Sequence, residues 1–123
     1  MKIKICSRSV LEKMSGSGFE PRTAVISITD VDEQEVGFYR EPDFLLRLCF
    51  DDINSPFDTY GDLRKLAVNL FSREQADQLA EFVFRCKDHI DILICQCRWG
   101  YSRSAAVAAA VREYFFQSGM EIF

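Results

Sequence analysis

Short apolar runs that alternate with longer amphipathic or polar stretches form the main pattern along this chain. Four runs are rich in aliphatic and aromatic residues and have the length of strands; they lie at residues 2–6, 23–29, 44–50 and 91–96. Three segments have helical signals, and they lie at residues 7–14, 72–87 and 103–117. The alternation predicts an α/β fold with a central, mostly parallel sheet of four to five strands and helices on both faces.

The ends and faces of these helices are also predicted by the sequence. Ser72 and Gln75 have the spacing of a capping box, so the second helix begins after Ser72. Residues 15–18, Ser-Gly-Ser-Gly, predict a loop after the first helix, and residues 30–40 predict a polar loop with a helical turn. Residues 104–111 carry no charge, which predicts that the last helix begins buried on all sides.

Composition limits the classes of function. A chain of 123 residues with no linker or repeat predicts a single domain, residues 1–123, and a net charge of −4 disfavours nucleic acids and anionic membranes as partners. No apolar run has the length of a membrane span, and residues 1–8 are too charged for a signal peptide, so we expect a cytoplasmic protein. Five cysteines, an odd number without framework spacing, predict reduced thiols.

The segment from residue 92 to residue 104 carries the strongest chemical signal. An apolar strand leads into Cys97, five residues separate Cys97 from Arg103, Gly100 lies between them, and Ser104 follows. A strand, a short loop and a helix N-terminus gather backbone N–H groups around one point, which favours a bound phosphate. The helix N-terminus and the guanidinium also favour the thiolate form of Cys97. Arg103 can hold two phosphoryl oxygens, and Gly100 permits a turn that a Cβ would obstruct.

This strand, loop and helix with Cys97, Gly100, Arg103 and Ser104 resembles the signature of the cysteine-dependent protein tyrosine phosphatases, most closely the small dual-specificity branch. The resemblance is specific over about residues 91–116, and it implies a phosphatase-like fold without metal or cofactor. It implies a catalytic Cys97, Arg103 and Ser104. The implied phosphate-binding residues are Arg98, Trp99, Gly100, Tyr101, Ser102 and Arg103.

The implied general acid is an aspartate on the loop after the third strand. Asp51 and Asp52 are the candidates. The resemblance favours Asp52, because members of the family place the acid two residues beyond the last apolar residue of that strand, which is Phe50 here. The implied reaction hydrolyses phosphotyrosine, phosphoserine or phosphothreonine, or a small phosphomonoester, through a phosphocysteine intermediate. Cys97 attacks phosphorus, Asp52 protonates the leaving oxygen, and water then releases phosphate with Ser104 stabilising the sulfur.

Two departures from the family pattern keep other functions open. Gln96 stands where the family usually has histidine, and Trp99 stands where a small residue is usual. One alternative is therefore a catalytically weak module that binds phosphate or phosphopeptides. Another is a thiol redox or arsenate-reductase-like enzyme, in which Cys95 would capture oxidised Cys97 as a disulfide. The chain stops soon after the last helix, so either a neighbouring copy in a homodimer covers the exposed face or this is a minimal version.

Overall fold

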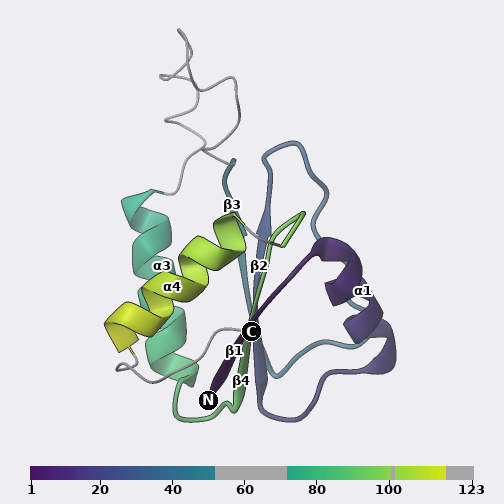
Figure 1. The fold of residues 1–123 in the computed structure, drawn as a ribbon, viewed down its shortest axis with the longest axis horizontal. Helices are drawn as coiled ribbons and strands as arrows, with labels where there is room; N and C mark the ends of the chain where they lie inside the picture. The colour runs from purple at the N-terminus through teal and green to yellow at the C-terminus, as the bar shows by residue number, and fades with distance from the viewer. Residues whose placement is uncertain (52–71, 101, 116–123) are drawn as a thin grey trace, which may run out of the picture.

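The fold is known from a computed structural model, which describes residues 1–51, 72–100 and 102–115. In chain order its elements are β1 (Lys2–Cys6), α1 (Arg8–Ser17), β2 (Thr23–Thr29), β3 (Phe44–Cys49), α3 (Arg73–Cys86), β4 (Ile92–Gln96) and α4 (Arg103–Phe115). Helix α1 covers one face of the sheet, and α3 and α4 cover the other (Figure 1). The predicted α/β fold with helices on both faces is therefore confirmed.

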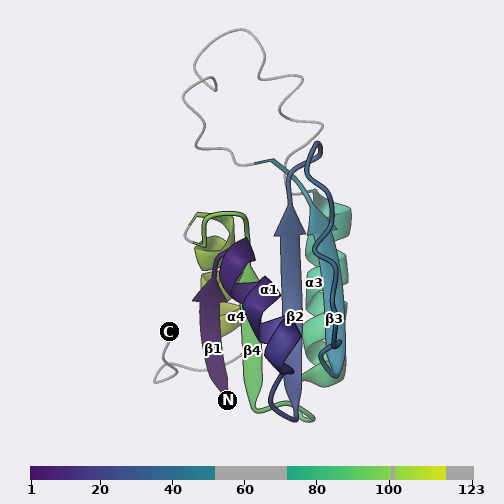
Figure 2. The ribbon, with the colours of Figure 1, turned by 90° about the vertical axis from the view of Figure 1, so that its right-hand side faces the viewer.

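The four described strands are all parallel and lie in the order β1-β4-β2-β3 (Figure 2). Every residue of β2 and β4 is buried, as expected of the central strands of a parallel sheet with both faces covered. The chain after β1 enters α1 on one face, whereas the chain after β4 enters α4 on the other. Open α/β sheets bind ligands at the carboxyl ends of two neighbouring strands whose following connections go to opposite faces of the sheet. Cys97 follows β4 at that point.

Two apolar layers hold the helices on the sheet. The layer beneath α3 and α4 is the larger and includes Ile26, Leu93, Phe82 and Val111, whereas the layer beneath α1 includes Leu11 and Ile94. Full burial of one such side chain stabilises the fold by about 1.5–3 kcal/mol. The two layers therefore fix the positions of α1 and α4, the helices on either side of the carboxyl end of β4.

Helix α3 begins as the sequence predicts. The Ser72 hydroxyl accepts a hydrogen bond from the backbone N–H of Gln75, and the Gln75 side chain accepts one from the backbone N–H of Ser72, each at 3.1 Å. This capping box satisfies two backbone donors that the first turn of a helix leaves without partners.

The end of α1 was predicted wrongly. The helix continues to Ser17, through three residues that the sequence assigns to a loop, and Gly18 ends it with φ +94° while its N–H donates to the Met14 carbonyl. The reason is a tertiary contact. Ser15 is buried, and its Oγ accepts a 2.7 Å hydrogen bond from the backbone N–H of Tyr39.

The prediction of all-round burial for the start of α4 is also wrong. Ser104, Val107, Ala108 and Val111 are buried, but Ala106 and Ala109 on the other side are exposed. Alanine has the highest helix propensity and little apolar surface, so an uncharged alanine run is stable with one face in water. None of the described helices is long and apolar enough to cross a bilayer.

Candidate active site

The loop between β4 and α4 brings Cys97 and Ser104 together. The Cys97 side chain is 2% exposed, and its Sγ lies 3.2 Å from the Ser104 hydroxyl at the start of α4. The thiol donates in this pair. On ionisation of the thiol the direction of the hydrogen bond reverses, and the Ser104 hydroxyl donates to sulfur. The predicted contact between the two side chains is therefore present. Tyr101, which the sequence analysis predicts to bind phosphate, lies outside the described residues.

Gly100 allows this loop to pack against the end of β1. Its φ is +81°, and a Cβ added there would lie 2.6 Å from the Ser7 backbone nitrogen and 2.7 Å from the Cys6 carbonyl carbon. The Arg8 backbone N–H donates to the Arg98 carbonyl at 3.2 Å and joins the same two segments. The prediction that a side chain at position 100 would obstruct the backbone is confirmed.

Arg103 has a buried guanidinium that is held on one side. Its side chain is 6% exposed, and its Nη1 donates to Asp30 Oδ1 at 2.6 Å and to the Phe50 carbonyl at 2.8 Å. Its Nε is buried and has no hydrogen-bond acceptor among the residues that the structure describes. A buried N–H without an acceptor costs about 1–3 kcal/mol, so this donor marks a place where an anion would be stabilised.

Asp30 is a residue of this site that the sequence analysis missed. It is the first residue after β2, and its Oδ2 lies 3.8 Å from Arg98 Nη1. The Arg98 guanidinium in turn lies 5.4 Å from the centre of the Trp99 ring, and residue Trp99 is 65% exposed. The available signal was the position of Asp30 at the carboxyl end of an apolar strand, where α/β folds place functional side chains.

The two candidates for the general acid differ in what the structure describes. Asp51 Oδ1 accepts a 3.1 Å hydrogen bond from the backbone N–H of Val31, so this carboxylate supports the loop that carries Asp30. Asp52 lies outside the described residues. The Phe50 carbonyl contacts Arg103 directly, which brings the segment that leads to both aspartates up to the loop.

Gln96 faces the α1 side of the sheet rather than the Cys97 side. It is fully buried, and its Oε1 accepts a 2.6 Å hydrogen bond from the Ser27 hydroxyl on the neighbouring strand β2. Its Nε2 is buried without a partner within the described ranges. The Gln96 side chain is thus held in the sheet by Ser27.

Two further thiols lie near Cys97. Burial, together with the nearby Cys97 sulfur, raises the pKa of Cys6 to about 11. Burial also raises the pKa of Cys95, and the sulfurs of Cys6 and Cys97 act in the same direction. Cys95 is fully buried. At neutral pH both thiols are protonated, which makes Cys95 a poor partner for the disulfide exchange that the redox alternative requires.

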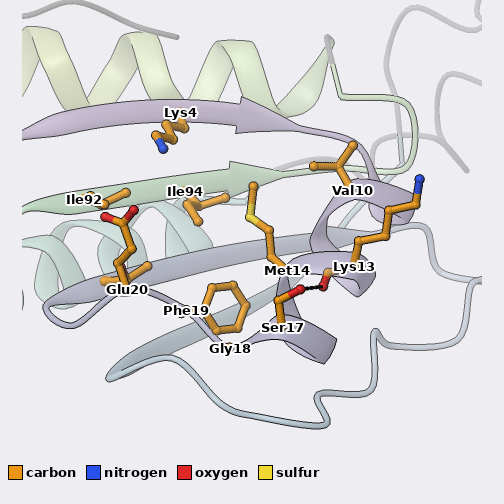
Figure 3. A pocket seen from close by; sticks show the side chains of 11 residues that line it. Lys4, Val10, Lys13, Met14, Ser17, Gly18, Phe19, Glu20, Ile92 and Ile94 are labelled. Carbon is orange, nitrogen blue, oxygen red and sulfur yellow. Dashed lines mark hydrogen bonds between the residues drawn. The ribbon is translucent and has the colours of Figure 1, made fainter.

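A separate cavity of about 330 Å³ lies between α1 and the sheet (Figure 3). Met14 reaches from α1 toward Ile94 of β4, and Lys4 lines the cavity from the neighbouring strand β1. Its lining includes the first residues of β2 and β4 but none of residues 96–104. The cavity is therefore distinct from the Cys97 loop, which joins β4 to α4.

Glu33 organises the loop that carries Asp30. Its Oε1 accepts a 3.0 Å hydrogen bond from the Asp30 backbone N–H, and its Oε2 accepts a 2.8 Å bond from Arg8 Nη1. Burial acts to raise the pKa of Glu33, but the Asp30 N–H and the Arg8 and Arg98 guanidiniums outweigh it and lower the pKa overall. The ionised carboxylate is thus favoured by folding. Its contribution to stability is complete above the unfolded pKa of about 4.3 and is lost as the pH falls through the lower folded pKa.

We therefore expect Glu33→Gln to lower the midpoint of thermal unfolding by about 2–5 °C at neutral pH. The difference from the wild type should shrink progressively as the pH falls below about 4.3. Circular dichroism melts over this pH series measure it, with Glu81→Gln, at an exposed position of α3, as the control that changes little. A difference that stays constant with pH would contradict this account of Glu33.

Comparisons of the chain with protein-family models, with curated proteins and with solved structures found no match. The assignment of chemistry therefore depends on the geometry of the loop and on its neighbours.

Proposed function

We propose that this protein is a cysteine-dependent phosphatase that hydrolyses phosphotyrosine through a phosphocysteine intermediate. Phosphoserine, phosphothreonine and small phosphomonoesters belong to the same proposed substrate class. The observation that carries the proposal is the environment of the Arg103 guanidinium. The guanidinium is buried, Asp30 and the Phe50 carbonyl hold its Nη1, and its Nε lacks an acceptor among the described residues.

The neighbours of Arg103 supply the other parts of the reaction. Ser104 follows it directly, and the Ser104 hydroxyl contacts the Cys97 sulfur at 3.2 Å. Both residues begin α4, whose N-terminal backbone N–H groups carry partial positive charge. A phosphoryl group bound by Arg103 at this helix end would lie next to the sulfur, and the same charges favour a thiolate.

The proposed reaction has two steps. In the first, the Cys97 thiolate forms a bond to phosphorus, the bond from phosphorus to the leaving oxygen breaks, and Asp52 donates a proton to that oxygen. In the second, water attacks phosphorus, the sulfur–phosphorus bond breaks, and Asp52 accepts the proton of the water. Ser104 donates a hydrogen bond to the departing sulfur, and Arg103 stabilises the charge on the phosphoryl oxygens in both steps.

Hydrolysis of p-nitrophenyl phosphate and of a phosphotyrosine peptide tests the proposal. We expect the wild-type protein to release phosphate from both, to keep this activity in the presence of a metal chelator, and to be inhibited competitively by tungstate, an analogue of phosphate. Matched phosphoserine and phosphothreonine peptides define the range of substrates. Tungstate binding by folded protein without phosphate release would overturn the enzymatic proposal in favour of a phosphate-binding module.

A further inference from the structure

The carboxylate of Asp30 lies between Arg98 of the Cys97 loop and Arg103 at the start of α4. Its Oδ1 is 2.6 Å from Arg103 Nη1, and its Oδ2 is 3.8 Å from Arg98 Nη1. Asp30 reaches this place because β2 and β4 are neighbours in the sheet, with Ser27 opposite Gln96. Their carboxyl ends therefore bring Asp30 and the Cys97 loop to the same edge.

The burial of Arg103 and of Asp30 indicates what this carboxylate does. The Arg103 side chain is 6% exposed and the Asp30 side chain 28%, so the guanidinium is more deeply buried than its partner. A buried cation without a counter-charge is strongly destabilised, and a flexible arginine relieves this by moving its head into water. Asp30 thus opposes the departure of Arg103 from the buried position next to Ser104.

The bonds of Arg103 also show which of its edges is in use. Nη1 donates to Asp30 and to the Phe50 carbonyl, whereas the buried Nε has no acceptor within the described residues. In a guanidinium, the Nε–H and one Nη2–H point in the same direction and match two oxygens of one phosphoryl group. Asp30 therefore holds the arginine by the nitrogen outside this edge.

We propose that Asp30 is a positioning residue, which holds Arg103 buried and oriented so that its Nε edge receives the phosphoryl oxygens. This inference rests on the proposed function, because it assigns Arg103 the role of phosphate ligand. Asp30 acts through Arg103 and does not touch the substrate. Its own loop is fixed from two sides, since Glu33 accepts a hydrogen bond from the Asp30 N–H and Asp51 accepts one from Val31.

The test compares Asp30→Ala with Asp32→Ala, an exposed aspartate on the same loop that removes the same charge. Three quantities are measured on each folded protein: tungstate affinity by calorimetry, kcat and KM for p-nitrophenyl phosphate, and the NMR signal of the Arg103 Nε–H. Arg103→Lys identifies that signal by its loss. Asp30→Asn, which keeps the shape and one acceptor oxygen, provides the measurement if the alanine variant does not fold.

We expect Asp30→Ala to weaken tungstate binding by about 10- to 100-fold, a loss typical of a displaced binding group. KM should rise and kcat should fall, because Arg103 contacts the phosphoryl group in both the ground state and the transition state. The Nε–H signal should shift and exchange faster with water. Asp30→Asn should lie between the wild type and Asp30→Ala, and Asp32→Ala should match the wild type in all three measurements.

Failure of the positioning role and failure of the phosphatase proposal give different results. If Asp30→Ala or Asp30→Asn binds tungstate as tightly as the wild type and keeps the Nε–H signal, the positioning role is overturned, whereas the phosphatase proposal stands as long as the wild type hydrolyses phosphate esters. If the wild type binds tungstate without turnover, the enzymatic proposal fails. The effect of Asp30→Ala on tungstate affinity then supports or overturns the positioning role on its own.

Discussion

Cys97→Ser is expected to lower kcat for p-nitrophenyl phosphate by about four orders of magnitude or more. A serine hydroxyl stays protonated at neutral pH, and the neighbouring Ser104 hydroxyl is no base for it. The replacement is nearly isosteric at a position that is 2% exposed, so the fold should persist. Tungstate affinity should remain measurable, because Arg103 and the start of α4 are unchanged. Steady-state kinetics together with calorimetry separate the two effects.

The matched control for this variant is Cys49→Ser. Cys49 is an exposed thiol at the end of β3, and its sulfur donates weakly to the Asp30 carbonyl at 3.5 Å, a bond that a hydroxyl preserves. We expect its kcat and KM to equal those of the wild type. Turnover by Cys97→Ser at a rate near that of the wild type would show that another group attacks phosphorus, and the phosphocysteine mechanism would then be wrong.

Gly100→Ala is expected to destabilise the protein by about 2–4 kcal/mol. A methyl group there lies within 2.7 Å of the backbone of Cys6 and Ser7, and the φ of +81° is unfavourable for any residue with a Cβ. These neighbours are main-chain atoms at the end of β1, so relief requires the loop to move away from the strand. The same movement shifts Cys97 and Arg103, and we therefore expect weaker tungstate binding as well. Urea unfolding and calorimetry measure the two losses.

Gly37→Ala provides the comparison for the loss of a glycine. Apart from Gly37 and its two chain neighbours, no atom lies within 4 Å of a Cβ placed at this position, and Gly37 is exposed and has no positive φ. Its free energy of unfolding should change by less than about 0.5 kcal/mol. A similarly small change in Gly100→Ala, with unaltered tungstate affinity, would contradict the packing of the loop against β1.

The sequence predicted most of the secondary structure because the relevant signals are local. Apolar runs located all four described strands, and the pair Ser72 and Gln75 located the start of α3 to the residue. The error at the end of α1 occurred because a distant contact outweighs a local preference. Ser15 remains helical because it contacts the backbone of Tyr39, 24 positions away in sequence.

The candidate site divides in the same way. Cys97, Gly100, Arg103 and Ser104 lie within eight consecutive positions, so their spacing alone indicated a loop able to bind an anion. The pair formed by Ser27 and Gln96, 69 positions apart, had no sequence signal. It depends on β2 lying beside β4, a neighbour relation that an apolar pattern does not encode.

The sequence by itself determined most of the positions of strands and helices, and it showed that one thiol and one guanidinium flank the same short loop, because backbone hydrogen bonding and periodicity act between near neighbours. Only the tertiary structure decided which carboxylate faces that guanidinium. Several aspartates follow apolar segments, but Asp30 contacts Arg103 across 73 positions of sequence. The physical reason is the strand order, which brings the carboxyl end of β2 next to that of β4, where a buried positive charge requires a negative partner.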